Sequence, residues 1–178
     1  MKQAVALKPN YSEAVFFLSQ IEIAEGNLIE ALASVESATL LDPQNPLVFF
    51  QLGLLRYHGE SWQNAIEAFE QAVALNTLYA NARYFLGLSY AQVGRTDDAA
   101  AQFEVVAQYN PDNEEVKAIL ENLRAGREPF ADGNVEPPEE RETLAAVLGG
   151  PRRGLSWLGQ EGALDFFDAK GVLEAALE

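Results

Sequence analysis

The chain has 178 residues, of which 48% are hydrophobic, and its 27 acidic and 12 basic side chains give a formal net charge of −15. This composition is typical of a globular protein with one domain, or with one domain and a fragment. The charge and the lack of a basic face exclude nucleic acid as the expected partner. The longest apolar run, LVFFQLGLL, is interrupted by Gln51, so no membrane span is predicted. The N-terminus lacks a signal-peptide pattern, and we favour a cytoplasmic location while the compartment stays unassigned.

The first residues have the pattern of the end of a helical repeat. The stretch KQAVALKPN is similar to QAVALNT at 71–77 and to ESATLLDPQ at 36–44. We therefore expect residues 1–11 to be a half repeat without its partner helix. The apolar edge left at Val5 and Leu7 suggests a further hypothesis, in which two chains associate end to end through this edge.

Three consecutive segments of 34 residues follow and align without a gap: 12–45, 46–79 and 80–113. The third has the most complete pattern, which consists of Leu86-Gly87, Tyr90, Ala99, Phe103 and Pro111. Each segment holds two apolar stripes at helical spacing. The pattern predicts helices over 12–25, 28–41, 46–58, 62–75, 80–93 and 96–109.

A glycine separates the two helices of the first and third segments. Gly26 and Gly94 stand at equivalent positions, where a helix can end in the left-handed conformation. The second segment departs from this pattern, because its glycine, Gly59, comes one residue earlier. A last apolar helix is predicted over 114–126, with Asn113 as its N-cap.

The period, and the residue types within it, resemble the tetratricopeptide repeat family over about residues 1–126. The resemblance implies an all-α fold, a right-handed α-solenoid of helix hairpins. We predict that a short α+β or poorly ordered tail follows this array. The array would comprise the half repeat 1–11, the three full repeats and the terminal helix 114–126.

The resemblance also implies a concave face that binds a partner, formed by the first helix of each repeat. The residues at the matching positions are mostly aromatic or aliphatic: Phe16, Gln20, Ile23, Leu47, Phe50, Leu54, Tyr57, Asn81, Tyr84 and Leu88. Such a surface suits an extended or helical peptide, or a partner protein, with apolar anchors. The alternative is that Phe16, Phe50 and Leu54 pack against neighbouring helices and contact no ligand.

One subtype of the family, the receptors of chaperone tails, holds a terminal carboxylate with a basic clamp. The matching positions here are Phe16, Gln20, Gln51, Asn81 and Phe85. None of these side chains is a cation, so the ion-pairing part of that recognition is absent. The resemblance therefore favours a protein or peptide partner with apolar anchors.

No feature of the sequence predicts catalysis. The single histidine, His58, has no second histidine to complete a metal site, and there is no cysteine. The stretch GGPRRGLSW at 149–157 lacks the phosphate-loop pattern and is interpreted as a turn. The acidic run at 136–142 is interpreted as a solvated linker. The sequence thus predicts no enzyme, no catalytic residue, no metal ligand and no cofactor.

The repeat pattern stops at Gly126. Residues 127–140 contain three prolines and are predicted to be a linker. Residues 131–178 resemble a stretch of the β chain of bacterial phenylalanyl-tRNA synthetase, with DFFD at 165–168 as its most distinctive part. The resemblance implies one or more strands followed by a helix within 141–178.

Two readings of this C-terminal segment stay open. In the first, it is a synthetase fragment, related to translation, that is fused or mis-joined to the repeats and has no activity of its own. In the second, it is a natural extension that folds onto the repeats.

Overall fold

The computed structural model describes residues 12–131, and within this range it contains seven helices and no strand. The helices are α2 (Ser12–Ala24), α3 (Leu28–Leu41), α4 (Pro46–His58), α5 (Trp62–Leu75), α6 (Ala80–Gln92), α7 (Thr96–Tyr109) and α8 (Glu114–Arg124). Each was predicted from the sequence, with ends that differ by two residues or fewer. The half repeat 1–11 and the predicted tail, with its strand and helix, lie outside the described residues.

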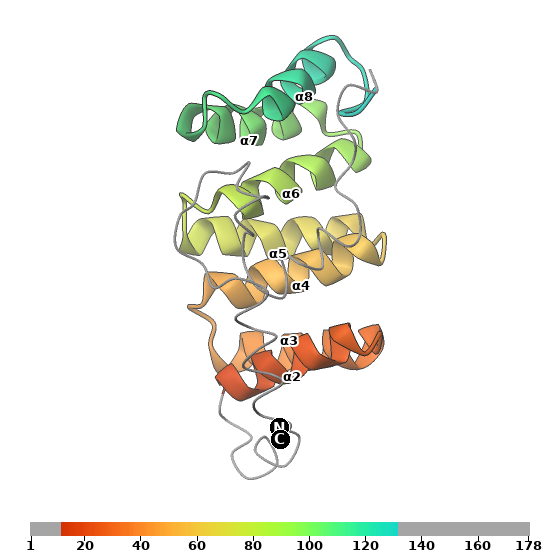
Figure 1. Ribbon diagram of the computed structural model, residues 1–178, viewed down its shortest axis with the longest axis vertical. Helices are drawn as coiled ribbons and strands as arrows, with labels where there is room; N and C mark the ends of the chain where they lie inside the picture. The colour runs from red at the N-terminus through yellow and green to blue at the C-terminus, as the bar shows by residue number, and fades with distance from the viewer. Residues whose placement is uncertain (1–11, 132–178) are drawn as a thin grey trace.

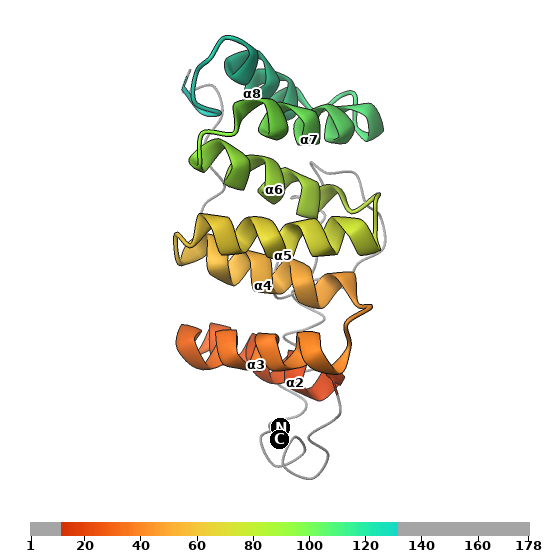
Figure 2. The same cartoon turned by 180° about the vertical axis from the view of Figure 1, so that it is seen from behind.

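The helices form two layers (Figure 1). Helices α2, α4, α6 and α8 lie in one layer, and α3, α5 and α7 lie in the other, which faces the viewer in Figure 2. Each helix packs against its neighbours in the sequence, and α4 also contacts α6. Over residues 12–131 the predicted all-α solenoid is therefore confirmed.

Close packing inside each helix pair explains the glycine and the phenylalanine of the repeat. A Cβ atom added to Gly87 on α6 would lie 2.7 Å from the Phe103 ring on α7. A Cβ atom added to Gly53 on α4 would collide in the same way with the Phe69 ring on α5. Both rings are completely buried. The glycine thus gives the ring of its partner helix the space that it needs.

The first helix pair uses a different combination at the same place. Ser19 on α2 replaces the glycine, and Val35 on α3 replaces the phenylalanine. Both side chains are completely buried. A larger side chain on one helix is matched by a smaller one on the other, which preserves the packed volume.

The turn inside each helix pair keeps its register through all three repeats. Gly26 and Gly94 have φ angles of 79° and 76°. The equivalent residue of the second repeat is Glu60, with φ of 54°, whereas Gly59 has φ of −79°. The second repeat thus departs in the residue type at this position, while the left-handed turn stays at the equivalent position, Glu60. Glu60 adopts a conformation that costs an L residue about 1–2 kcal/mol relative to glycine.

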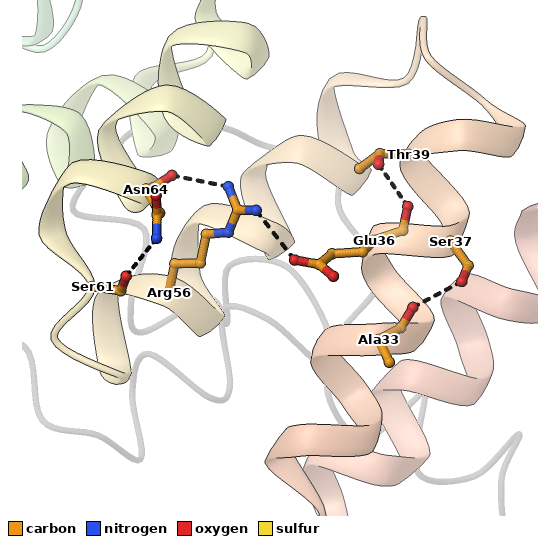
Figure 3. Close-up of polar contacts among 7 residues, drawn as sticks. All are labelled: Ala33, Glu36, Ser37, Thr39, Arg56, Ser61 and Asn64. Carbon is orange, nitrogen blue, oxygen red and sulfur yellow. Dashed lines mark hydrogen bonds and ion pairs between the residues drawn. The ribbon is translucent and has the colours of Figure 1, made fainter.

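A polar contact joins the first two helix pairs near the surface (Figure 3). Arg56 on α4 binds the Glu36 carboxylate on α3 at 3.2 Å. The same guanidinium donates to the carbonyl oxygen of Asn64 on α5, also at 3.2 Å. Arg56 therefore connects three helices, although both acidic and basic groups keep contact with water and the ion pair itself is weak.

The chain does not leave the array where α8 ends. Asn122 on α8 donates its Nδ2 proton to the carbonyl oxygen of Pro129 at 3.1 Å. Pro129 is buried, and Phe130 packs against the main hydrophobic core. Residues 127–131, which begin the predicted linker, thus lie on the last helix of the array.

Candidate functional site

All ten residues predicted to form the partner-binding surface lie on α2, α4 and α6, in one layer of the array. The structure buries six of them: Gln20, Ile23, Phe50, Leu54, Tyr84 and Leu88. Three are half-buried: Phe16, Tyr57 and Asn81. Leu47, at the start of α4, is 45% exposed. We call the part of this layer that α2, α4 and α6 form the front face.

Phe50 belongs to an aromatic cluster that joins the second and third repeats. Its ring centroid lies 4.9 Å from Tyr79, 5.9 Å from Phe69 and 6.1 Å from Phe85. Leu54, one turn later on α4, is part of the same core. Phe50 and Leu54 therefore pack against neighbouring helices, as the alternative reading of the sequence expected, and partner contacts by them stay a proposal.

Tyr57 and Tyr84 continue this cluster along the front face. The Tyr57 ring lies 4.9 Å from Trp62 and 5.6 Å from Phe85, and burial raises the pKa of Tyr57 to about 12. The Tyr84 hydroxyl donates to the Glu115 carboxylate on α8 at 2.7 Å. Burial first, and then the Glu115 charge, raise the pKa of Tyr84 well above its usual value. Tyr84 thus places an acidic group beside the front face.

A polar contact between Ser19 and Gln51 crosses the front face from α2 to α4. The Ser19 hydroxyl donates to the Phe16 carbonyl oxygen at 2.6 Å. A hydroxyl has one proton, so the Ser19 oxygen can only accept in its contact with Gln51, whose Nε2 atom lies 3.3 Å away. Because the Ser19 oxygen accepts, the amide group of Gln51 must point its NH2 toward Ser19, and this fixes the orientation of the amide. Its Oε1 atom is turned away from Ser19 and has no donor.

Gln20 provides a second acceptor of the same kind on α2. Its Oε1 atom is enclosed and has no donor, and the side chains of Gln20 and Gln51 are only 9% and 1% exposed. A buried acceptor without a partner costs about 1–3 kcal/mol, and native proteins contain few of them. Helices α2 and α4 of the front face therefore enclose two carbonyl oxygens that have no donor among the described contacts.

The predicted surface includes Gln20 but not Gln51. Gln51 was noted only at a position that matches the basic clamp of the chaperone-tail receptors, where its neutral amide replaces a clamp residue. The signal was nevertheless present, because Gln51 is the one polar residue within LVFFQLGLL, a run of nine residues. A polar side chain in the middle of a buried apolar stretch requires a partner or a function.

Between residues 12 and 131, no group of three His, Cys, Asp or Glu side chains could hold a metal ion. Among the seven helices of that range, none has the length and apolar character needed to cross a membrane. His58 lies at the end of α4, with its ring 6.0 Å from that of Tyr57.

Comparison with known proteins adds a sequence match to this geometry. A family model described as "Tetratricopeptide repeat" matches residues 60–123, which contain α5, α6, α7 and most of α8. The chain is also 31% identical over 84 residues to "Anaphase-promoting complex subunit 3" of Schizosaccharomyces pombe and to "Protein bimA" of Emericella nidulans. These matches cover 47% of this chain but only 13% and 10% of those two proteins.

Solved structures with a similar fold include MamA, with a TM-score of 0.64 and 22% identity over 99% of this chain and 86% of that chain. YrrB, described as "a TPR protein with an unusual peptide-binding site", has a TM-score of 0.63 and 20% identity over 97% of this chain and 79% of that one. The "First TPR of Spaghetti (RPAP3) bound to HSP90 peptide SRMEEVD" has a TM-score of 0.61 and 20% identity over 65% and 91%, respectively.

The fold of the described residues is thus that of a tetratricopeptide repeat solenoid. The family match over residues 60–123 supports the resemblance drawn from the 34-residue period. The resemblance to phenylalanyl-tRNA synthetase stays a sequence prediction, because residues 132–178 lie outside the described part of the chain.

Proposed function

We propose that the array is a non-enzymatic scaffold whose front face binds a peptide segment of a partner protein. The observation that carries this proposal is the pair of enclosed acceptors without donors, Gln20 Oε1 and Gln51 Oε1. An extended peptide offers backbone N–H groups at regular spacing, and these are suitable donors. Binding would satisfy these two acceptors if the front-face helices open enough to admit the peptide backbone, because neither oxygen has exposed surface.

The chemistry of the front face also indicates which peptides it would select. Two unpaired acceptors favour a ligand that brings donors, whereas a terminal carboxylate would bring only further acceptors. An acidic group lies beside this face, since the Tyr84 hydroxyl donates to the Glu115 carboxylate. The ligand is therefore an internal peptide segment with neutral or basic side chains, and a free C-terminal carboxylate is not required.

The exposed residues of the front face supply the apolar contacts. Leu47 is the most accessible of the predicted set, and Tyr57 and Phe16 are half-buried. Aromatic side chains of this kind dominate the energy of many interfaces. The buried residues of the predicted set, such as Phe50 and Tyr84, form the core that supports the exposed ones. A similar solved structure with a bound peptide, and another with a peptide-binding site, support a peptide as the ligand class.

The alternative, a phenylalanyl-tRNA synthetase fragment without activity of its own, concerns residues outside the described range. No contact of the described array favours it. It remains an alternative that rests on the sequence of residues 131–178 alone.

Selection of peptides from a random display library on the full chain tests the proposed function. The affinity of a selected peptide is then measured by calorimetry for wild type and for Leu47→Glu. Leu47→Glu should weaken binding about tenfold or more, because a charge replaces an apolar contact. Leu40→Glu is the matched control, since Leu40 is 84% exposed on α3 in the other layer. Equal affinities of the two variants and the wild type would contradict the proposal.

A further inference from the structure

Helix α3 carries an exposed apolar stripe in the layer that faces the viewer in Figure 2. Four exposed residues follow one line along the helix, at spacings of four, three and four residues: Ile29, Ala33, Glu36 and Leu40. Such spacings place side chains above one another on one side of an α-helix. Ile29 and Leu40 are 83% and 84% exposed, and about 17 Å of helix separates them. We call these four residues the α3 stripe.

The other two repeats show that the fold does not need large apolar side chains at the two ends of the stripe. The residues equivalent to Ile29 and Leu40 are exposed and polar or small: Gln63 and Ala74 on α5, and Asp97 and Gln108 on α7. Only the first repeat has two large apolar side chains at these exposed positions. An apolar surface that the packing of the repeat does not require indicates an interaction site.

The polar side chains beside the stripe are already engaged within the array (Figure 3). The Ser37 hydroxyl donates to the Ala33 carbonyl oxygen at 2.9 Å, and the Thr39 hydroxyl donates to the Glu36 carbonyl oxygen at 2.7 Å. The Glu36 carboxylate binds Arg56. A partner that covers this surface therefore leaves neither hydroxyl without an acceptor, which lowers the cost of removing water from it.

The charge of the first repeat indicates the chemistry of the partner. Residues 12–45 contain six acidic side chains and no basic one, whereas 46–79 contain three and one, and 80–113 contain four and two. Glu30 lies in the first turn of α3, and Asp42 follows its last turn. Both ends of the α3 stripe are therefore beside a carboxylate, and a basic partner complements this surface.

The same charges disfavour a second copy of the chain as the partner. Two copies that met stripe to stripe would bring Glu30 and Asp42 of each copy close to the same groups of the other. Like charges repel within the Debye length of about 8 Å, and the net charge of −15 adds to this repulsion. A stripe that is one helix wide instead suits a single helix, because packed helices interlock through rows of residues three and four apart.

We propose that the α3 stripe is a second protein-binding surface, whose ligand is a basic amphipathic helix of a partner protein. Apolar side chains of that helix cover Ile29 and Leu40, and lysine or arginine side chains beside them pair with Glu30 and Asp42. The stripe and the front face lie in different layers, so both can be occupied at the same time. This inference goes beyond the proposed function and does not depend on it.

A synthetic amphipathic peptide of leucine and lysine, with its leucines along one side of the helix, is the probe for the full chain. Calorimetry compares wild type with Ile29→Gln/Leu40→Gln, which copies the residues at the equivalent positions 63 and 108. The repeats already accept glutamine there, so the variant should fold. Its affinity for the peptide should fall about tenfold or more, because two apolar contacts are lost.

The matched control for this variant is Leu78→Gln/Val93→Gln, which removes two exposed apolar side chains outside the first repeat. It should bind the peptide as tightly as wild type. An Ile29→Gln/Leu40→Gln variant that binds as tightly as wild type, or a control that is weakened equally, would overturn the inference.

Neutral substitutions test the charge of the site with the same peptide. Glu30→Gln/Asp42→Asn should weaken binding about fivefold at low salt, and the difference should decrease as salt screens the ion pairs. Glu67→Gln/Asp97→Asn is the matched control, because it removes the same charge from exposed positions on α5 and α7. Equal weakening by the two variants would contradict the pairing of a basic helix with Glu30 and Asp42.

Exposure of the stripe in the full chain distinguishes the other occupants. A soluble paramagnetic chelate should strongly broaden the Ile29 δ1 methyl signal, while those of Ile66 and Ile119, which are buried, stay sharp. Protection of Ile29 at every protein concentration would show that the chain covers its own stripe. Protection that increases with protein concentration would show that a second copy covers it. Either result would overturn the inference.

The outcomes for the inference and for the proposed function are distinguishable. A library peptide whose affinity falls with Leu47→Glu is bound by the front face, whereas one whose affinity falls only with Leu40→Glu is bound by the α3 stripe. Weaker binding of the leucine–lysine peptide by Ile29→Gln/Leu40→Gln, with no library peptide that depends on Leu47, would support the inference and contradict the proposed function. The opposite pair of results would support the proposed function and overturn the inference.

Discussion

Gln51 on α4 donates its Nε2 proton to the hydroxyl oxygen of Ser19 on α2, at 3.3 Å. Since the Ser19 proton is already used on the Phe16 carbonyl oxygen, this contact leaves Gln51 Oε1 unpaired inside the protein. The same hydrogen bond that joins two repeats therefore leaves an enclosed acceptor between α2 and α4, two helices of the front face.

Gln51→Leu should affect binding more than stability. Replacing an unpaired buried amide by an apolar side chain of similar shape is close to neutral for folding, because a desolvation cost and one long hydrogen bond are lost together. Affinity for a selected peptide should fall by about 1 kcal/mol, the typical value of one hydrogen bond, or about fivefold. Calorimetry and urea unfolding measure the two effects, with Gln71→Leu on α5 as control. A variant that binds as tightly as wild type would contradict the role of Oε1.

Gly87→Ala should destabilise the third repeat by about 1–3 kcal/mol, because its Cβ atom would be forced against a completely buried ring. Phe103→Val in the same chain should recover part of this loss, since it copies the smaller partner found in the first repeat. The free energy of unfolding in urea measures the coupling between the two positions. Additive effects of the two substitutions would show that the glycine and the ring do not limit each other.

Glu60→Gly should stabilise the protein by about 1 kcal/mol, because Glu60 has a positive φ angle that glycine adopts without strain. The reverse change at the equivalent position, Gly94→Glu, should cost about 1–2 kcal/mol. Midpoints of urea unfolding report both changes. If Glu60→Gly lowered the midpoint, the left-handed turn at this position would not be a source of strain.

Stability should fall in alkaline solution because two tyrosines of the front face hold their protons. The pKa of Tyr57 is raised to about 12 by burial, and that of Tyr84 is raised well above normal by burial and Glu115. An unfolded tyrosine titrates near pH 10, so above this pH the unfolded state binds fewer protons than the folded state. The contribution of these two tyrosines to the free energy of unfolding is therefore fully present below about pH 10 and decreases as the pH rises through about 12.

Urea unfolding at about pH 8 and about pH 11 measures this decrease. Tyr84→Phe is the test variant. It should lower the midpoint at the lower pH, because the hydrogen bond to Glu115 is lost, and it should show a smaller further decrease at the higher pH. An identical pH dependence in wild type and variant would exclude Tyr84 as a source.

The 34-residue period allowed the helices to be predicted, because apolar stripes and turn residues are local signals. It also identified the layer that holds the candidate surface. The burial of individual side chains within that layer was not predictable. Leu47 and Leu54 are both leucines of α4, yet Leu47 is exposed and Leu54 has no accessible surface. Their difference depends on the size of side chains on other helices, which the period of a single sequence does not specify.

Two further features depend on more than one residue. The left-handed turn at Glu60 is set by the packing of the helices on either side, and this overrides the preference of glycine for the position. The unpaired oxygen of Gln51 depends on where the Ser19 hydroxyl places its proton, and so on the Phe16 carbonyl oxygen. Sequence reasoning could indicate a polar residue in an apolar run but could not determine the direction of its amide.

The most direct test of the front face as a peptide-binding surface is an NMR titration of the isotope-labelled full chain with a selected library peptide. The account predicts that the side-chain amide signals of Gln20 and Gln51 shift with the same affinity that calorimetry gives. The signals of Gln63 and Gln71 on α5 should not change. Saturated binding that shifts the α5 signals and leaves Gln20 and Gln51 unchanged would contradict the account.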